Sequence, residues 1–269
     1  MILLKVLKRQ DGKLISPFQK FEYEEGKEYV CVDFDTNPQE DCSMGYYATD
    51  IDGLIFSFRN LPSYEVWECK VSGQKVEYDQ FKRRYEKLKL LRQVPFEEVK
   101  QLALAEEPKV GYKLAEALFP VNPLKIQRNS LPTKTEIELL EKWNSVGASV
   151  RDSVWDSIGA SIGASVRDSV RASVRDSVRD SVRDSVWDSV WVSIWASVWD
   201  SVGAYMSSLF PGIKKWEYID HPEDENPFQP CIDIWHRGLV PGFDGKVWRL
   251  HAGEKAEVMW EGKLEGGGE

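Results

Sequence analysis

Residues 145–204 repeat a four-residue unit without interruption, and this repeat restricts the fold more than any other feature of the chain. The first unit is Ser145-Val146-Gly147-Ala148 and the last is Ser201-Val202-Gly203-Ala204, which makes fifteen units. Each unit consists of a serine, a valine or isoleucine, a variable residue, and usually an aspartate or alanine. A strict period of this kind is the signature of a repeat architecture.

A single long α-helix fits a period of four poorly. Positions four apart in an α-helix are rotated by about 40°, so the column of aliphatic residues would wind around the helix axis. Supercoiling accommodates repeats near about 3.5 or 3.67 residues per turn, whereas 4.0 requires a much larger distortion. Serine, valine, aspartate and glycine are also middling or poor in helix interiors. Serine, aspartate and glycine are poor strand formers as well, so composition alone does not decide.

We therefore predict a β-solenoid for residues 145–204, with a long α-helix or a helical hairpin as the alternative. In the solenoid, valine and isoleucine point inward and stack into ladders. Serine and aspartate occupy the corners, where their side chains can bond neighbouring backbone groups. Coils of twelve or of sixteen residues are both compatible with the four-residue unit. Each coil buries its faces only against neighbouring coils, so the array needs a cap at both ends.

The third position of the unit holds residues that no single packed environment accepts. It is glycine four times, arginine six times and tryptophan five times, which spans a large range of volume and a full charge. We predict that this column faces outward and binds a partner, because a patch of indole rings typically marks a contact surface. The predicted partner-binding residues are Trp187, Trp191, Trp195, Trp199, Arg175, Arg179 and Arg183.

Two other interpretations of the same column stay open. Trp187, Trp191, Trp195 and Trp199 occupy four consecutive units, so the C-terminal segment from Tyr205 or a second protomer could cover them. The arginine-rich units alternate arginine with aspartate, which is typical of a solvated face whose charges compensate one another. Tryptophan, arginine and glycine also share codons that differ in one base, so the array resembles a tandem expansion of a short element.

The flanking sequence predicts two mixed regions. We expect an α+β domain over residues 1–121, a linker and capping helix over 122–144, the array over 145–204, and a small α+β cap with a hairpin and a disordered tail over 205–269. Expected strands in the first domain are Ile2–Leu7, Glu28–Phe34, Gly53–Phe58 and Tyr64–Val71, with Lys75–Tyr78 completing a hairpin across Ser72-Gly73. Phe81–Val94 is compatible with a strand or a helix.

Helix signals are clearest next to the array. Pro95–Glu106 begins with proline, and Val110–Leu118 ends before Pro120. Thr135 and Glu138 have the spacing of a capping box for a helix over residues 136–143 that continues into the array. After the array we expect a short helix over residues 231–237, ended by Gly238, and a hairpin of strands 246–251 and 256–260.

Several stretches outside the array resemble a known family. They are Pro17–Lys27, Cys42–Ala48, Tyr64–Lys70 and Phe81–Tyr85, together with Trp235–Pro241 and Trp248–His251. These stretches are similar to a domain of unknown function in uncharacterised bacteriophage and metagenomic prokaryotic proteins, where it commonly precedes pentapeptide-like repeats. Related domains often have histidine at the place of Tyr47. The resemblance implies no activity, cofactor or site residue.

Composition disfavours several functions. The formal net charge is −9, and the array contributes six arginines against eight aspartates, so both flanks are mildly acidic and nucleic-acid binding is disfavoured. The N-terminus carries lysines and an arginine where an export signal needs an apolar core, and no apolar run is long enough to span a membrane. We therefore expect a cytoplasmic protein whose four cysteines are reduced thiols.

Catalytic signals are weak. Cys42 lies near Asp41 and Tyr47, and Asp50 with Asp52 makes half of a calcium loop that lacks its closing glutamate, so we expect a solvated turn there. The three histidines have no helical ligand spacing, and we predict no metal or cofactor. We expect a non-catalytic repeat scaffold that binds a macromolecular partner or self-associates. The alternative is an enzyme or small-ligand binder that uses a cleft in the N-terminal domain.

Overall fold

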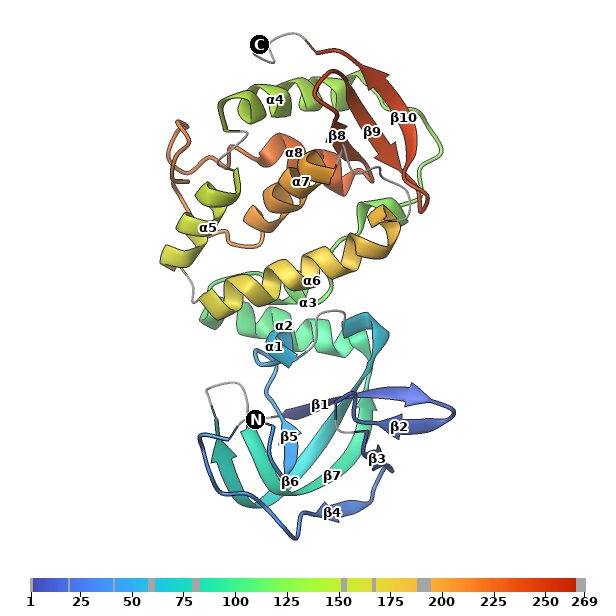
Figure 1. The fold of residues 1–269 in the computed structure, drawn as a ribbon, viewed down its shortest axis with the longest axis vertical. Helices are drawn as coiled ribbons and strands as arrows, with labels where there is room; N and C mark the ends of the chain where they lie inside the picture. Colours follow the sequence, from blue (N-terminus) through green and yellow to red (C-terminus); the bar gives the residue numbers. More distant parts are fainter. Residues whose placement is uncertain are drawn as a thin grey trace. The chain divides into compact units, whose positions relative to one another are not determined.

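The chain divides into two compact units in the computed structural model (Figure 1). Residues 2–18, 20–40, 42–57, 61–78, 83–150, 154–165, 168–187 and 195–264 are described. Unit 1 comprises Met1–Val110 and Ala117–Phe119, and unit 2 comprises Gly111–Glu116 and Pro120–Glu269. The chain changes unit three times, after Val110, after Glu116 and after Phe119, and the second of these points lies in the short helix α3 (Leu114–Leu118).

Unit 1 is built on one antiparallel sheet, which Figure 1 shows as a curled half-barrel. Its strand order is β3-β2-β1-β6-β7-β4, and β5 pairs with β7 as well. Thr49, which follows β5, exchanges two backbone hydrogen bonds with Leu4 of β1, at 2.7 and 2.9 Å. This link joins the two sides of the curled sheet. The strands are β1 (Leu3–Gln10), β2 (Lys13–Ile15), β3 (Glu22–Tyr23), β4 (Glu28–Val30), β5 (Tyr46–Ala48), β6 (Glu65–Glu77) and β7 (Arg83–Val94).

The alternation of side chains in the strands places a core on the inner face of the sheet. In β1, Leu7 belongs to this core and Leu3 packs against it, whereas Leu4 and Val6 point to the opposite face. Members of the inner core from the other elements are Leu14, Tyr23, Ala48, Trp67, Cys69, Tyr85, Leu88 and Leu90. The helices α1 (Leu54–Ser57) and α2 (Phe96–Val110) contribute the buried residues Leu54, Ile55, Val99 and Ala103.

Two local expectations in unit 1 are wrong. The segment expected as a strand over Gly53–Phe58 forms the short helix α1. The expected hairpin across Ser72-Gly73 is absent, because β6 continues to Glu77 and pairs along its length with β7. Ser72-Gly73 forms a bulge in that pairing: Gly73 has a φ of +79°, and the next N–H, of Gln74, donates to the Glu86 carboxylate at 2.8 Å.

Unit 2 combines helices with a three-stranded antiparallel sheet of order β10-β9-β8. The central helix is α7, which packs against α5, α6, α8 and β8. The expected short helix and hairpin after the array are present as α8 and as β9 with β10. The elements are η2 (Pro123–Lys125), α4 (Lys134–Val150), α5 (Val154–Ser165), α6 (Asp168–Trp187), α7 (Trp195–Ser207), α8 (Gln229–His236), β8 (Val240–Phe243), β9 (Trp248–Ala252) and β10 (Glu257–Gly262).

The β-solenoid prediction for residues 145–204 is wrong. Every described residue of the array is α-helical, and these residues are divided among the end of α4, all of α5 and α6, and most of α7. The alternative predicted helix, but as one long helix or one hairpin. A series of short helices escapes the objection to a long one, because each helix ends before the 40° rotation per unit accumulates through a full turn.

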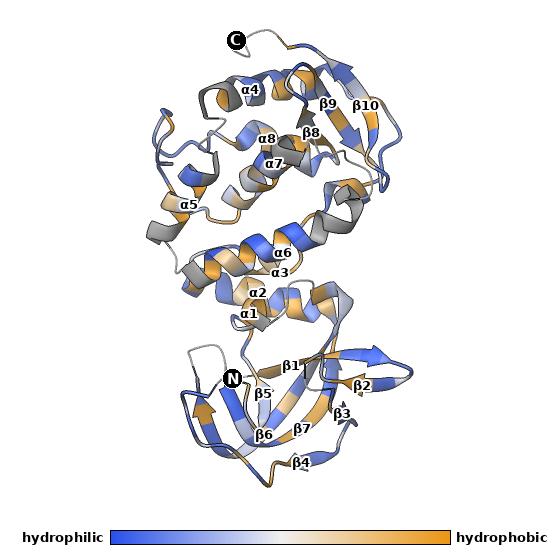
Figure 2. Ribbon diagram, in the orientation of Figure 1, coloured by the Kyte–Doolittle hydropathy of each residue, from blue (hydrophilic) through white to orange (hydrophobic). Residues whose placement is uncertain are grey.

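Serine is the reason why the rotation is tolerated within each helix. The buried residues of α6 are Val170, Val174, Ser177 and Val178, which is the i, i+4, i+7, i+8 spacing of an amphipathic helix. Each serine precedes its valine by one residue and therefore lies about 100° away around the helix axis. Along the helix the valines turn away from the buried face, and the serines turn onto it. Figure 2 shows the resulting alternation of hydrophobic and hydrophilic bands along α6.

The predicted orientation of the columns holds only in part. Seven of the described aliphatic members are buried, as expected: Ile158, Ile162, Val170, Val174, Val178, Val198 and Val202. Val146, in the first unit, is half-buried. In the third column the Arg175 side chain is 49% exposed, Arg179 and Trp199 are half-buried, and Gly203 is buried. The outward prediction is therefore wrong at Gly203, because α7 is the central helix of unit 2 and is surrounded by other elements.

The capping box of α4 lies two residues earlier than expected. Thr133 is the cap: its hydroxyl accepts from the Glu136 N–H at 3.4 Å, and its own N–H donates to the Glu136 carboxylate at 2.7 Å. Arg128 fixes this register, because its guanidinium donates to both Glu136 carboxylate oxygens at 2.7 and 3.1 Å. Thr135, the residue with the expected spacing, lies inside the helix.

The last turn of α7 is part of the core of unit 2. Tyr205 stacks on Trp235 with ring centroids 5.2 Å apart, and its hydroxyl donates to Glu116 at 2.8 Å. The same hydroxyl accepts from the Val121 N–H at 2.9 Å. The end of the array is thereby tied to α8 and to the segment before η2. In the described part of the chain, none of the helices combines the length and apolar character that crossing a membrane requires.

Candidate binding site

Four aromatic rings meet at the inner side of the curled sheet of unit 1. They are Phe21, Tyr23, Tyr29 and Tyr46, from β3, β4, β5 and the residue before β3, and we call them the aromatic cluster. All six pairs of rings have centroids between 4.8 and 6.3 Å apart. The interplanar angles of 54–82° are edge-to-face or tilted, which is the arrangement that aromatic quadrupoles favour.

A buried lysine lies at the base of the cluster. The Lys5 ammonium sits 4.9 Å from the centroid of the Tyr23 ring and donates to the Tyr47 carbonyl at 2.8 Å. Burial lowers the pKa of Lys5 to about 8, so the amine still carries its charge at neutral pH. Burial also raises the pKa of the Tyr23 hydroxyl, which has no hydrogen-bond partner among the described residues.

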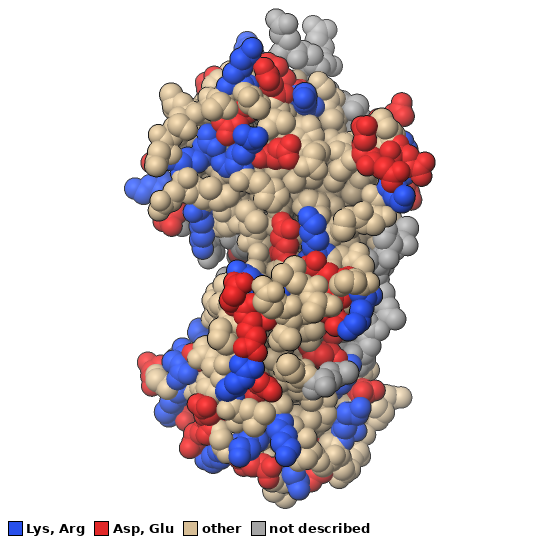
Figure 3. Space-filling view, turned by 180° about the vertical axis from the view of Figure 1, so that it is seen from behind, with Lys and Arg blue, Asp and Glu red and all other residues tan. Residues whose placement is uncertain are grey.

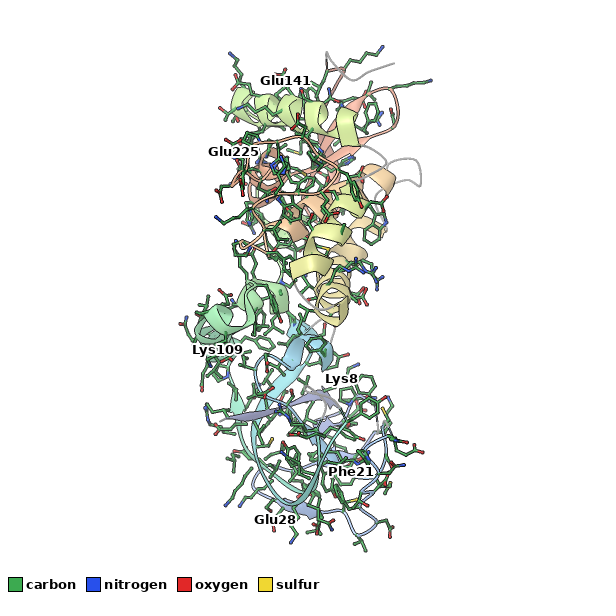
Figure 4. All side chains as sticks on the ribbon, turned by 90° about the vertical axis from the view of Figure 1, so that its left-hand side faces the viewer. Lys8, Phe21, Glu28, Lys109, Glu141 and Glu225 are labelled. Carbon is green, nitrogen blue, oxygen red and sulfur yellow. The ribbon has the colours of Figure 1, made fainter. Side chains whose placement is uncertain are left out.

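The outer part of the cluster is accessible. Phe21 is 37% exposed, and Tyr29 and Tyr46 are half-buried (Phe21 is labelled in Figure 4). The segments that carry these rings also carry four exposed apolar side chains, Phe18, Val30, Val32 and Met44, at 76, 49, 91 and 55% exposure. Exposed apolar and aromatic residues concentrated in this way are typical of a contact surface.

The same segments are acidic. Between residues 20 and 40 the chain has seven carboxylates and two lysines, a formal charge of −5. Lys27 pairs with Glu24 at 2.5 Å, and Lys13 of β2 pairs with Glu22 at 2.8 Å. Elsewhere on unit 1 acidic and basic side chains lie interspersed, as the view in Figure 3 shows. A cationic group would therefore be attracted to the segments around the aromatic cluster.

Arg84 holds the loop between β4 and β5 in place. Its guanidinium is 2% exposed and donates to the carbonyl groups of Asp35, Asn37 and Glu40 at 2.9, 2.5 and 2.7 Å. Gly45 makes room for it: this residue has a φ of +147°, and a Cβ there would lie 3.0 Å from Cγ of Arg84. Sequence reasoning missed this role, because an arginine within a strand pattern does not indicate that its guanidinium is buried.

A pair of carboxyl groups lies at the turn after β5. Asp50 pairs with Arg83 at 2.5 Å. Burial opposes ionisation of Asp50, but hydrogen bonds from Asp52 and Arg83 outweigh it and lower its pKa. Burial, followed by the hydrogen bond to Asp50 and the charge of Asp50, raises the pKa of Asp52 to about 7. The expected solvated turn is thus a half-buried pair that shares a proton, and Arg83 opposes cation binding there.

Replacing Asp52 with asparagine is expected to stabilise the protein in a pH-dependent way. The pKa of Asp52 is raised by folding, so the stability that its protonated form contributes is lost as the pH rises through about 7. The side-chain amide of the variant would keep a donor for Asp50 without this loss. We expect D52N to gain about 1 kcal/mol over wild type near neutral pH, once solvent screening is allowed for, and little near pH 4.

Thermal melting of the two proteins at several pH values measures this difference. D50N is the matched control, because it removes the carboxylate that pairs with Arg83 and should destabilise the protein at neutral pH. A constant difference between D52N and wild type across the pH range would contradict the shared proton.

The residues predicted as partner-binding lie on α6 and α7, or outside the described residues. Arg175 and Arg179 form ion pairs with Asp176 at 3.5 and 3.4 Å, which supports a face whose charges compensate one another. Trp199 is half-buried on α7. Trp191 lies outside the described residues, as do the side chains of Trp187, Trp195 and Arg183.

The cysteine candidate lies at the surface of unit 1. Cys42 is exposed in a turn with a φ of +57°, and the Tyr47 hydroxyl donates to the Ser43 carbonyl at 3.0 Å. Asp41 lies outside the described residues. Within the described ranges, no three His, Cys, Asp or Glu side chains come together in a way that could hold a metal ion.

The comparisons with known proteins identify no relative. The chain matches no protein-family model, no curated protein and no solved structure. The resemblance to bacteriophage and metagenomic proteins therefore stays a prediction.

Proposed function

We propose that this chain is a non-catalytic binding protein, and that unit 1 contacts a macromolecular partner through the aromatic cluster and its adjoining loops. One observation carries the proposal: Phe21, Tyr29 and Tyr46 are partly exposed in mutual ring contact, within segments that expose Phe18, Val32 and Met44. Tyrosine and phenylalanine supply large contact area at low conformational cost and are enriched at interfaces.

A partner with positive charge fits this surface better than a second copy of the same chain. Self-association across the cluster would bring two segments of charge −5 together, and like charges across an interface are unfavourable. A basic protein segment would instead meet the carboxylates of residues 20–40 and release their mutual repulsion. Of the two binding modes that the sequence predicts, the electrostatics favour a different protein as partner.

The helices of the array would then serve as the scaffold of unit 2. Trp187, Trp191, Trp195 and Trp199 stay predicted contact residues of the same kind, as do the arginines of α6. Compartment and partner identity belong to the same proposal: a reduced, cytoplasmic setting is the one that the sequence predicts.

A double variant, F21S/V32S, is expected to lose partner binding while it stays folded. Val32 is 91% exposed, whereas Phe21 is 37% exposed and packs against the other three rings, so the change removes contact surface together with part of the ring packing. The matched control is L131S, which removes an apolar side chain that is 71% exposed in unit 2. Cross-linking and affinity purification of the full chain from its native host, with quantitative mass spectrometry, compares the three proteins.

The proposal predicts that some host proteins are recovered equally with wild type and with L131S. The recovery of these proteins with F21S/V32S should be about tenfold lower, because the loss of roughly 1.4 kcal/mol of binding free energy weakens affinity tenfold. A thermal melt within a few degrees of wild type establishes that the double variant is folded. Equal recovery by all three proteins would rule out the aromatic cluster as the contact surface.

A further inference from the structure

One face of the Tyr29 ring is covered by an ammonium group of the chain itself. The Lys27 ammonium lies 5.3 Å from the ring centroid and 2.5 Å from a carboxylate oxygen of Glu24. The ring is held in position, because its hydroxyl accepts from the Glu24 N–H at 2.8 Å and Phe21 packs edge-on with centroids 5.2 Å apart. An aromatic face and a carboxylate thus form a seat for a cation, and Lys27 occupies it.

The same cluster holds a second ammonium group in a different way. Lys5 lies against Tyr23 and is fully enclosed, with a hydrogen bond to a backbone carbonyl. The Lys27 side chain is 53% exposed, and its partner Glu24 is 69% exposed. Ion pairs between exposed side chains contribute little to stability, so the Lys27 ammonium can leave its seat at small cost. Lys5 is part of the fold, whereas Lys27 is exchangeable.

We propose that the Tyr29 face binds a trimethylated lysine of the partner, whose quaternary ammonium group displaces the primary ammonium group of Lys27. This inference rests on the proposed function, since it names the group that the partner inserts. A plain lysine of the partner would only replace like with like, against a competitor tethered two residues from Tyr29. A trimethylated ammonium loses less hydration on contact and binds aromatic faces well.

Negative charge around the seat supports the same occupant. Displacing Lys27 frees the Glu24 carboxylate, and Glu25 and Glu28 are exposed in the same turn. Glu28 is labelled in Figure 4. A trimethylated ammonium donates no hydrogen bond, so its attraction to these carboxylates is long-range and needs no exact geometry. An uncharged group of the same shape would gain neither this attraction nor the cation–ring contact.

The test uses choline as the probe for the quaternary ammonium group, and 3,3-dimethylbutan-1-ol as its uncharged counterpart. The full chain is labelled in its tyrosine rings, and ring resonances are followed by NMR during titration at constant ionic strength. Choline is expected to bind in the millimolar range and the alcohol much more weakly. A peptide with one trimethyl-lysine should shift the same resonances as choline, and the unmodified peptide should not.

Variants at Lys27 make the competition measurable. K27M removes the competing cation and keeps the aliphatic stem, so choline should bind about threefold to fivefold more tightly than to wild type. K27R keeps a cation on the Tyr29 ring and should bind choline with the affinity of wild type. Y29L should lose choline binding. Since Lys27 is exposed, both Lys27 variants are expected to fold, and they keep the test decisive even if Y29L is unstable.

Equal affinity of K27M and wild type for choline, or equal binding of choline and the alcohol, would overturn this inference. If choline fails while F21S/V32S still depletes the partner, the proposed function stands and only the ligand class is wrong. If choline binds at Tyr29 while F21S/V32S recovers every partner, the proposed function is wrong and the cation seat stands.

Discussion

Replacing Val174 with aspartate is expected to unfold the helical part of unit 2. Val174 is fully buried in α6, between Val170 and Val178. The substitution loses the burial of an aliphatic side chain and places a carboxylate at a position that is closed to water. The combined cost is on the order of 4 kcal/mol or more, which is a large part of the stability of an ordinary domain.

Urea unfolding followed by circular dichroism at the helical minimum measures this loss in the full chain. Arg175 supplies the matched control, because it is the next residue and its side chain is 49% exposed. R175Q should change the free energy of unfolding by less than about 0.5 kcal/mol. Similar losses for V174D and R175Q would mean that α6 does not bury its valine column.

Replacing Arg84 with methionine is expected to give the largest effect in unit 1. The side chain keeps a similar length, but three carbonyl groups and the Asp35 carboxylate lose their donor. Breaking a buried charged network in this way costs about 3–5 kcal/mol, unless the loop detaches and its carbonyl groups reach water. In either case residues 35–40, which lie between the Tyr29 and Tyr46 strands, are held less firmly than in wild type.

Hydrogen–deuterium exchange of peptides covering residues 31–45, together with thermal melting, measures the release of this loop. R84K is an informative comparison. A lysine keeps the positive charge, but its compact ammonium group lacks the planar fork with which a guanidinium reaches three separated carbonyl groups. G45A should resemble R84M in direction, since its Cβ would crowd Arg84. Exchange and melting of R84K equal to wild type would contradict the clamp.

Prediction from sequence succeeded where one pattern determines one element. The strand expected over Ile2–Leu7 is present as β1, and the helix expected over Pro95–Glu106 is present as α2. The first is an apolar run of strand length, and the second begins with proline, which is favoured in the first turn of a helix. The prediction for the array failed for a physical reason. It compared the four-residue period with one continuous helix that buries only aliphatic residues, whereas the chain forms several helices and buries serine beside valine.

The aromatic cluster could not be derived from spacing, because strand pairing brings its members together. Tyr29 and Tyr46 are 17 positions apart, and the pairing of both β4 and β5 with β7 places their strands next to each other. One signal did point there. Phe21, Tyr23 and Tyr46 all lie in the stretches that resemble the bacteriophage domain, although the resemblance implies no role for them.

The division of the array into packed helices bears on how its length can change over time. Tandem repeats gain and lose whole units by slippage during replication, and an open solenoid absorbs such changes by growing or shrinking at one end. In a helix packed on both sides, one added unit advances the downstream residues by about 6 Å and turns them by about 40°. About nine units, or ten helical turns, must be added before the downstream residues again point to the same side of the helix. The copy number of this array is therefore held by the contacts of α7 with its neighbours, although its sequence looks free to vary.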